Sequence, residues 1–230
     1  MHVFSKPVMA SGSLRVLSAL LGYPDREMRS HFSEMQDILD RENALSAERR
    51  TEIAALIEVL RRADPLEAEA EYVQLFDRGR ATSLHLFEHV HGDTRERGPA
   101  LVDLAQTYEK AGLYLAPGEL PDYLPAVLEF ISTQPPSEAR AFLGEMSHIF
   151  NALFGALQER ASPYASVLGA LLELSGGKAQ PVRSPIELPL DESWIEPPVF
   201  DGCSARGQSR PGQPQPIHLV RKSARTGVVV

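Results

Sequence analysis

The sequence predicts an all-α protein, with a single globular helical domain of about eight to nine helices and an extended or disordered C-terminal tail. Hydrophobic residues make up 43 % of the 230 residues but aromatic residues only 7 %, a balance that favours Leu- and Ala-rich helices over a β-sandwich. Apolar residues recur at helical spacing, and no convincing alternating strand precedes residue 180. Gly and Pro then make up a quarter of residues 175–230, so this part can bury little apolar surface.

Four helices are expected in the first third of the chain. Ser11 or Ser13 can cap the first, and Pro24 ends it because proline disfavours helix at the residue before it. The second is expected over residues 25–40. The third carries an i, i+3, i+4, i+7 stripe of apolar residues: Ile53, Leu56, Ile57 and Leu60. Pro65 is well suited to the first position of the fourth helix, which runs into the sequence YVQLFD.

Four further helices are expected in the second half. One carries a stripe that ends near Gly112: Leu101, Leu104, Ala105 and Tyr108. A short helix follows over residues 121–131, and a long one begins at about Ser137, after a pair of prolines. Pro163 starts the last helix, which ends at a pair of glycines before residue 178.

The composition divides the chain into a helical domain over residues 1–176 and a Pro- and Gly-rich tail over residues 177–230. One apolar island, WIEPPVF, occupies residues 194–200 of the tail. It has two interpretations, which are not exclusive. The island can be a docking strip for a partner, or a strap that packs on the protein's own domain.

The acidic composition and the scarcity of cysteine argue against several classes of function. The net charge of -8 and the pI near 5.4 disfavour nucleic acid as the main partner, because its phosphate backbone is negative. Cys203 is the only cysteine, so one chain can form no internal disulfide or cysteine-based zinc site. No signal peptide is evident, and no apolar run reaches the roughly 18 residues of a membrane span. We therefore expect a cytoplasmic protein without direct membrane insertion.

The chain also lacks the motifs of common cofactor enzymes. It contains no phosphate-binding loop of the Walker A type, no dinucleotide-binding glycine motif and no nucleophile elbow of the serine hydrolases. The sequence therefore predicts a protein that is not an enzyme and that carries no cofactor.

A histidine cluster is the strongest candidate for catalysis or metal binding. His85 and His89 lie four residues apart on an expected helix, so both can face one way, as a pair of metal ligands requires. His91 follows closely. The spacing is not that of the HExxH zinc motif, and no third ligand set is evident. A polar, hydrogen-bonded helix end is therefore the favoured interpretation, and a metal-binding enzyme using His85, His89 and His91 is the alternative.

Arginines and carboxylates near the histidines raise two further alternatives. The arginines can clamp an anion bidentately, but acidic residues interleave with them, so intramolecular salt bridges are favoured. They are Arg78, Arg80, Arg95 and Arg97. Glu119 and Asp122 can form an acid–base pair. Pro121 lies between them and other catalytic parts are missing, so helix capping or partner recognition is favoured.

Four sequence elements resemble one protein family. Residues 72–113, YVQLFDRGRATSLHLFEHVHGDTRERGPALVDLAQTYEKAGL, resemble the signature region of the NarJ-type chaperones, also called the delta subunit of respiratory nitrate reductase. LLGYPD at residues 20–25 and ELPDYLP at residues 119–125 resemble two further elements of that family. The island at residues 194–200 is similar to its C-terminal end. The resemblance spans about residues 14–200, and its central run is the most specific part.

The resemblance implies an all-helical cytoplasmic chaperone that is absent from the finished enzyme. It implies binding to the apo catalytic (alpha) subunit of respiratory nitrate reductase, including its N-terminal segment, support of molybdenum cofactor insertion, and delayed membrane anchoring. The insertion machinery for the cofactor is a further implied partner, and another molybdoenzyme is the alternative client. The motifs mark these candidate partner-binding positions: Tyr72, Leu75, Phe76, Asp77, His85, Leu86, His89, His91, Glu119, Asp122 and Tyr123. Leu75, Phe76 and Leu86 can equally be core residues.

Overall fold

The computed structural model describes residues 10–91 and 94–177, which form helices and connecting segments without a β-strand. The predicted all-α fold is confirmed. The eleven α-helices of these residues are α1 (Ser11–Leu21), α2 (Arg26–Ser30), α3 (Phe32–Glu42), α4 (Ala47–Arg62), α5 (Pro65–Tyr72), α6 (Leu86–Val90), α7 (Arg97–Lys110), α8 (Leu124–Ser132), α9 (Pro136–Glu145), α10 (Ser147–Glu159) and α11 (Ala165–Ser175). The predicted tail, with its island at residues 194–200, lies outside the described residues.

The helices outnumber the eight or nine expected because two expected helices are broken. The helix expected over residues 25–40 divides into α2 and α3 at His31, whose φ of -93° and ψ of 1° leave the helical range. The helix expected from Ser137 divides into α9 and α10 at Met146, with φ -87° and ψ -1°. Neither break residue is a glycine or proline, although Gly144 lies two residues before Met146.

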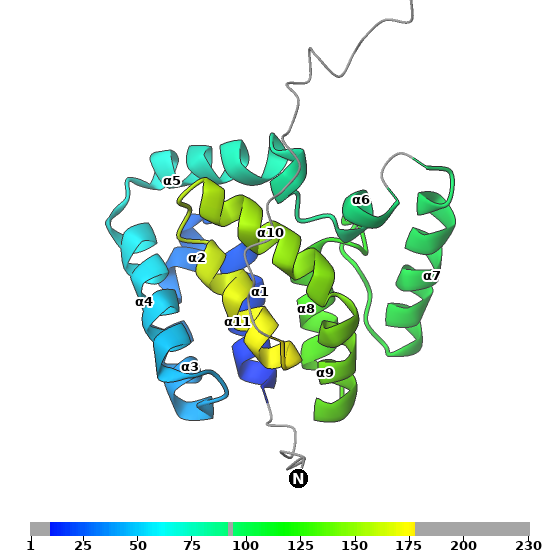
Figure 1. Ribbon diagram of the computed structural model, residues 1–230, viewed down its shortest axis with the longest axis horizontal. Coiled ribbons are helices and arrows are strands. Elements are labelled where there is room, and N and C mark those ends of the chain that lie inside the picture. The colour runs from blue at the N-terminus through cyan, green and yellow to red at the C-terminus, as the bar shows by residue number, and fades with distance from the viewer. Residues whose placement is uncertain (1–9, 92–93, 178–230) are drawn as a thin grey trace, which may run out of the picture. The chain divides into compact units, whose positions relative to one another are not determined.

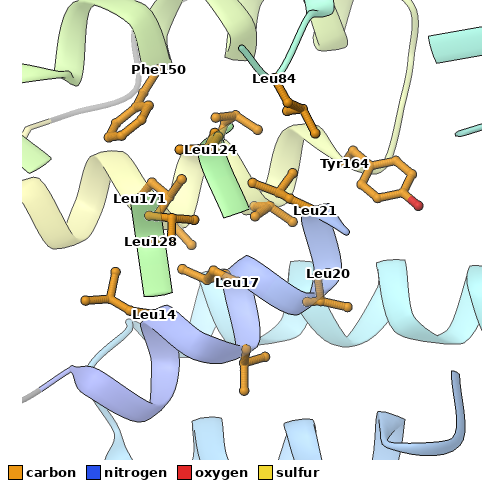
Figure 2. Close-up of a cluster of buried hydrophobic side chains, with 14 of the residues drawn as sticks. Leu14, Leu17, Leu20, Leu21, Leu84, Leu124, Leu128, Phe150, Tyr164 and Leu171 are labelled. Atoms are coloured by element: carbon orange, nitrogen blue, oxygen red, sulfur yellow. The ribbon is translucent and has the colours of Figure 1, made fainter. Parts of the chain in front are cut away.

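The core forms around α1, which packs against α3, α8 and α11 (Figure 1). Figure 2 shows Leu14, Leu17 and Leu21 of α1 directed toward Leu128 of α8 and Leu171 of α11. All five side chains are almost fully buried, and burying a leucine stabilises a fold by roughly 2 kcal/mol. The buried side chains thus place α8, and the loop that precedes it, firmly against α1.

A π-helix continues α5, and a turn follows it. α5 runs into η1 (Val73–Asp77), and a short 3-10 helix, η2 (Arg80–Thr82), follows. The Thr82 hydroxyl donates a hydrogen bond to the Leu75 carbonyl at this turn. A Cβ atom on Gly79 would collide with Thr82 Oγ1 and lie 3.0 Å from the Leu75 oxygen. Only glycine fits there without a shift of its neighbours, so Gly79 permits the turn that leads toward α6.

The α7 helix lies at one edge of the molecule, beyond α6 (Figure 1). Gly112, with a φ of +78°, ends it, and the Leu113 amide donates back to the Tyr108 carbonyl at 2.9 Å. The chain then returns to α8 through a loop. We call residues 97–120, which comprise α7 and most of this loop, the arm. No helix within the described ranges is long and apolar enough to cross a membrane.

Candidate functional site

Two segments from different sequence elements pair at the centre of the site. His85 and Tyr123 form an isolated antiparallel β-bridge. The Leu86 amide donates to the Asp122 carbonyl at 3.0 Å, and the Leu124 amide donates to the Leu84 carbonyl at 2.8 Å. This pairing explains why the helix expected from Pro121 begins only at Leu124. It joins the HLFEH and ELPDYLP sequences into one structure.

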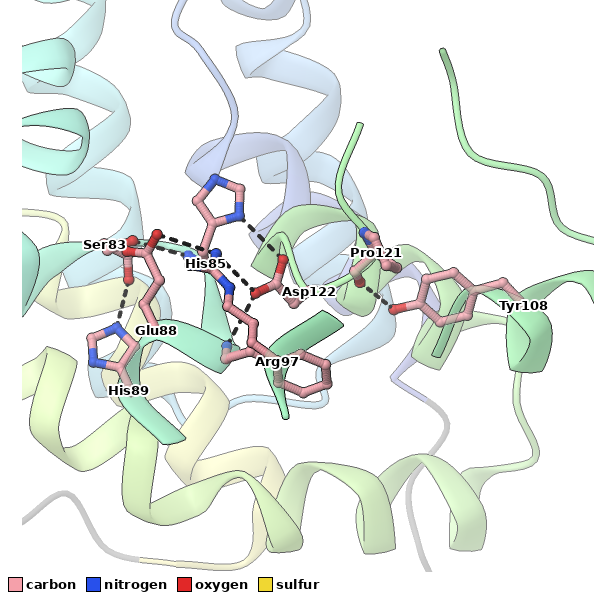
Figure 3. A network of polar contacts seen from close by, with 9 residues as sticks. Ser83, His85, Glu88, His89, Arg97, Tyr108, Pro121 and Asp122 are labelled. Carbon is pink, nitrogen blue, oxygen red and sulfur yellow. Dashed lines mark hydrogen bonds and ion pairs between the residues drawn. The ribbon is translucent and has the colours of Figure 1, made fainter. Parts of the chain in front are cut away.

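Asp122 caps a helix that is distant in sequence. Its carboxylate is fully buried and accepts hydrogen bonds from the Phe87 amide at 3.1 Å and from His85 Nδ1 at 3.3 Å (Figure 3). His85 occupies the N-cap position of α6 but makes no side-chain cap, so the Asp122 carboxylate supplies the acceptor. The capping role expected for Asp122 is confirmed, although it acts on α6 and not on α8.

Opposite charges alternate around Asp122. Arg97 Nη2 lies 3.2 Å from Glu88 Oε1 and 3.8 Å from Asp122 Oδ2. The hydrogen bond to Asp122 raises the pKa of His85, although burial opposes this. Burial alone would raise the pKa of Asp122, but the His85 and Phe87 hydrogen bonds and the charges of His85 and Arg97 lower it. Asp122 is therefore an ionised, buried anchor that holds α6 and the first turn of α7.

The three histidines do not form one cluster. His85 lies outside α6 in an extended conformation, so the expectation that it shares a helix face with His89 is wrong. His89 Nε2 lies 2.8 Å from the Ser83 carbonyl oxygen, and the ring of His91 stands edge-on to Phe87 at 5.4 Å between centroids. Over the described parts of the chain, no group of three or more His, Cys, Asp or Glu side chains is placed to hold a metal ion. The rings are oriented by separate hydrogen bonds and ring contacts.

A second network consists of tyrosines. The Tyr72 hydroxyl is 2.7 Å from the Leu21 carbonyl, to which it donates, and 3.0 Å from the Tyr123 hydroxyl. The Tyr23 ring stands edge-on to Tyr72 at 5.6 Å between centroids, and its hydroxyl donates to Glu69 Oε2 at 3.0 Å. The rings of His85 and Tyr123 lie 5.5 Å apart. The aromatic and charged networks therefore meet at Tyr123.

The negative charge of Asp77 acts on the whole tyrosine network. Desolvation raises the pKa of Tyr23, Tyr72 and Tyr123, and Asp77 raises each of them further. The three hydroxyls are therefore protonated at neutral pH and act as donors within this hydrogen-bond network. We call the surface formed by Tyr23, Glu69, Asp77, His85 and Tyr123 the tyrosine face.

The predicted site residues differ in their exposure to solvent. Four are buried and form the scaffold beneath the site: Tyr72, Phe76, Leu86 and Asp122. Five are partly buried: Leu75, His85, His89, His91 and Tyr123. Asp77 and Glu119 are exposed. Sequence reasoning did not select Tyr23 or Glu69, although Tyr23 belongs to the LLGYPD element and is 46 % exposed.

The salt bridges expected for the arginines are found at Arg97, whereas Arg78 bonds to an amide side chain. Arg97 takes part in the ion pairs with Glu88 and Asp122, and Arg78 Nη1 donates to Gln74 Oε1 at 3.3 Å. Sequence reasoning grouped Arg97 with the other arginines and did not connect it to Asp122. Arg97 and Asp122 are far apart in the sequence and come together only in the folded protein, so no local sequence pattern could have connected them.

Comparisons with known proteins point to one family. A family model described as nitrate reductase delta subunit matches residues 42–169. The Escherichia coli (strain K12) nitrate reductase molybdenum cofactor assembly chaperone NarJ is 44 % identical over 162 residues, which cover 70 % of this chain and 69 % of that protein. The probable chaperone NarJ of Bacillus subtilis (strain 168) is 31 % identical over 156 residues, covering 68 % of this chain and 84 % of the relative.

A solved structure shares the fold. The crystal structure of a putative redox enzyme maturation protein from Archaeoglobus fulgidus aligns with a TM-score of 0.53 and 22 % sequence identity. The alignment covers 75 % of this chain and 96 % of the other. The helical arrangement described above is therefore also found in a protein of low sequence identity.

Proposed function

The chain belongs to the nitrate reductase delta subunit family, and on that premise we propose that it is a system-specific maturation chaperone for respiratory nitrate reductase. In this function it binds the apo catalytic subunit, supports insertion of the molybdenum cofactor and is absent from the finished enzyme. Its relatives are described as nitrate reductase molybdenum cofactor assembly chaperones. We assign no catalytic step to the chain.

One observation supports a particular surface of the molecule as the place where the client binds. Three of the sequence elements that carry the resemblance are far apart in the chain, yet each contributes a tyrosine to one network. Tyr72 contacts both Tyr23 and Tyr123. Their contacts build a scaffold that is buried at Tyr72 and Asp122 and presents polar and aromatic groups at its surface. Such a surface suits the recognition of another protein, in which exposed aromatic residues and polar rims are common.

The tyrosine face favours a client segment that carries basic and apolar residues. Asp77 is exposed and Glu69 is partly buried, and both carboxylates act on the tyrosines of the face. The chain as a whole has a net charge of -8. Opposite charge on the client accelerates the encounter and selects the partner. The hydrogen bonds beneath the face hold it in one arrangement before the client binds, which reduces the ordering cost of association.

The finer steps of the proposed function follow from this recognition. We include in it binding of the N-terminal segment of the catalytic subunit and a delay of its membrane anchoring until the cofactor is in place. A chaperone bound to the catalytic subunit can sterically prevent its membrane anchoring, while the cofactor insertion machinery still has access to that subunit.

Isothermal titration calorimetry tests the proposal with a peptide that copies the N-terminus of the nitrate reductase catalytic subunit. We expect a dissociation constant in the micromolar range or lower, and about tenfold weaker binding by the Tyr23→Ala variant, because interface aromatics often contribute this much. The Leu66→Ala variant is a matched control, since Leu66 is 74 % exposed on α5 and lies outside the face. Absence of binding by both the intact peptide and the apo subunit would refute the proposal.

A further inference from the structure

A groove with a volume of about 350 Å³ lies between the arm and the helical bundle. Five groove residues belong to the arm: Tyr108, Leu113, Tyr114, Leu115 and Glu119. The opposite wall includes Arg15 of α1 and Glu129 and Phe130 of α8. The groove adjoins the candidate site, because the Tyr108 hydroxyl donates to the Pro121 carbonyl at 2.8 Å, on the side of Pro121 away from His85 (Figure 3).

The groove combines an apolar floor with a charged rim. Tyr108 and Phe130 are buried, and their ring centroids lie 4.8 Å apart. Tyr114 is 81 % exposed at the mouth. Glu119 and Glu129 are exposed, and among the described residues neither carboxylate takes part in an ion pair. Arg15 is the one cation of the lining, and its Nε donates to Ser132 Oγ at 3.3 Å. The rim therefore keeps an excess of negative charge.

We propose that this groove is a docking site for a segment of the client that carries one large apolar side chain flanked by lysine or arginine. The inference rests on the proposed chaperone function and adds a second contact surface to the tyrosine face. The apolar side chain enters between Tyr108, Leu115 and Phe130, and Tyr114 covers it. The basic side chains lie against Glu119 and Glu129.

Charge and size favour this occupant over two others. A second copy of the chain carries the same acidic groove and a net charge of -8, so self-association through this face is electrostatically opposed. The apolar island of the tail contains Glu196 and is flanked by Asp191, Glu192 and Asp201, and the negative rim repels these acidic residues. The volume is at the low end of the roughly 300–1,000 Å³ of ligand sites, which suits an anchoring side chain better than a whole helix.

The position of the arm sets the geometry of the groove, because the arm forms one of its walls. Tyr108 and Arg97 attach α7 to the adjacent residues Pro121 and Asp122 through a hydrogen bond of 2.8 Å and an ion pair of 3.8 Å. Glu119, on the rim, lies two residues before Pro121. A client segment in the groove therefore contacts the same loop that orders the tyrosine face, so both surfaces can bind one client together.

Photocrosslinking identifies the occupant directly. The full chain with the substitution Tyr114→p-benzoylphenylalanine is mixed with the apo catalytic subunit and irradiated, and crosslinked peptides are mapped by mass spectrometry. We expect crosslinks to a client segment that contains lysine or arginine within one helical turn of the attached residue. Crosslinks only to residues 178–230 of the same chain, or only to a second copy, would overturn the inference.

Affinity measurements with the apo subunit separate the groove from the chaperone function itself. We expect about tenfold weaker binding for Tyr114→Ala. The double variant Glu119→Gln and Glu129→Gln should bind roughly threefold more weakly and depend less on salt. Leu66→Ala and Glu145→Gln, exposed positions outside the groove, should bind as the unmodified chain does. Equal binding by all variants would overturn only the proposal that the groove is a docking site. Absence of binding by the unmodified chain would overturn both this proposal and the chaperone function.

Discussion

The hydroxyl groups of Tyr72 and Tyr123 lie 3.0 Å apart and join the C-terminal end of α5 to the loop before α8. Tyr72 is buried and also donates to the Leu21 carbonyl at the end of α1 at 2.7 Å. This hydroxyl therefore links three chain segments that surround the tyrosine face. Its role in the stability of the face can be separated from the packing of its ring.

Replacement Tyr72→Phe keeps the ring contacts with Tyr23 and Phe76 but removes the hydroxyl. We expect the free energy of unfolding to fall by about 1–2 kcal/mol, because the Leu21 carbonyl loses this donor and Tyr123 loses its partner. Urea denaturation followed by circular dichroism measures the change. Tyr114→Phe, at an 81 % exposed position, should change stability by less than about 0.5 kcal/mol. Equal effects of the two changes would contradict a structural role for the Tyr72 hydroxyl.

Replacement Asp122→Ala removes the acceptor for the Phe87 amide and the buried partner of His85 and Arg97. We expect a loss of about 3 kcal/mol of stability, because positive groups lose their buried counter-charge. Hydrogen exchange should also become faster at the Phe87 amide than at amides of α1. Asp103→Ala is the control, since Asp103 is exposed on α7. Retained protection of the Phe87 amide in Asp122→Ala would disprove the capping role.

The His85–Asp122 pair predicts a pH dependence of stability. The folded-state pKa of His85 is raised above its usual 6.5, so its contribution is complete below pH 6.5 and is lost as the pH rises through the raised value. The folded-state pKa of Asp122 is lowered below its usual 3.8, so its contribution is complete above pH 3.8 and is lost as the pH falls through the lowered value. The pair therefore stabilises the fold most between these limits.

The His85→Gln variant measures this dependence by urea denaturation at about pH 5.5 and at about pH 8.5. We expect the stability deficit of the variant to be larger at the lower pH. Glu88 and Arg97 are the other charged groups that act on His85, and both are present in the variant. His148→Gln, at an exposed position of α10, serves as the control. A deficit of equal size at the two pH values would show that the charge of His85 does not contribute.

Gly79 lies in the turn after η1, and Gly98, in the first turn of α7, serves as its control. Gly79→Ala introduces a Cβ that collides with Thr82 Oγ1 and approaches the Leu75 carbonyl oxygen, so we expect a loss of about 1–3 kcal/mol. Gly98 is helical in α7, and no atom lies within 4 Å of its added Cβ. Gly98→Ala should therefore leave stability unchanged or raise it by up to about 1 kcal/mol. Thermal unfolding of both variants checks the difference, and a stable Gly79→Ala variant would disprove the steric requirement.

The local sequence determined the all-α class and several helix boundaries, because capping and proline chemistry act over a few residues. Asp25 accepts from the Met28 amide and Ser46 from the Arg49 amide at the starts of α2 and α4, and Pro65 begins α5. Gly176 follows α11 with a φ of +83°. Other sequence elements, chiefly residues 72–113, carried the resemblance to a family, and the family model that matches residues 42–169 confirms that family.

Only the tertiary structure decided how the site is assembled. The sequence placed His85 and His89 on one helix face, whereas pairing with Tyr123 holds His85 outside α6. Asp122 caps α6 through an amide 35 positions away, and Arg97 approaches the same carboxylate from α7. Periodicity and capping rules describe neighbours within a few residues, so they contain no information on such distant pairs. These pairs form because burial of α1 and α8 in the core brings the loop before α8 to the start of α6, where a buried carboxylate needs donors and a helix end needs an acceptor.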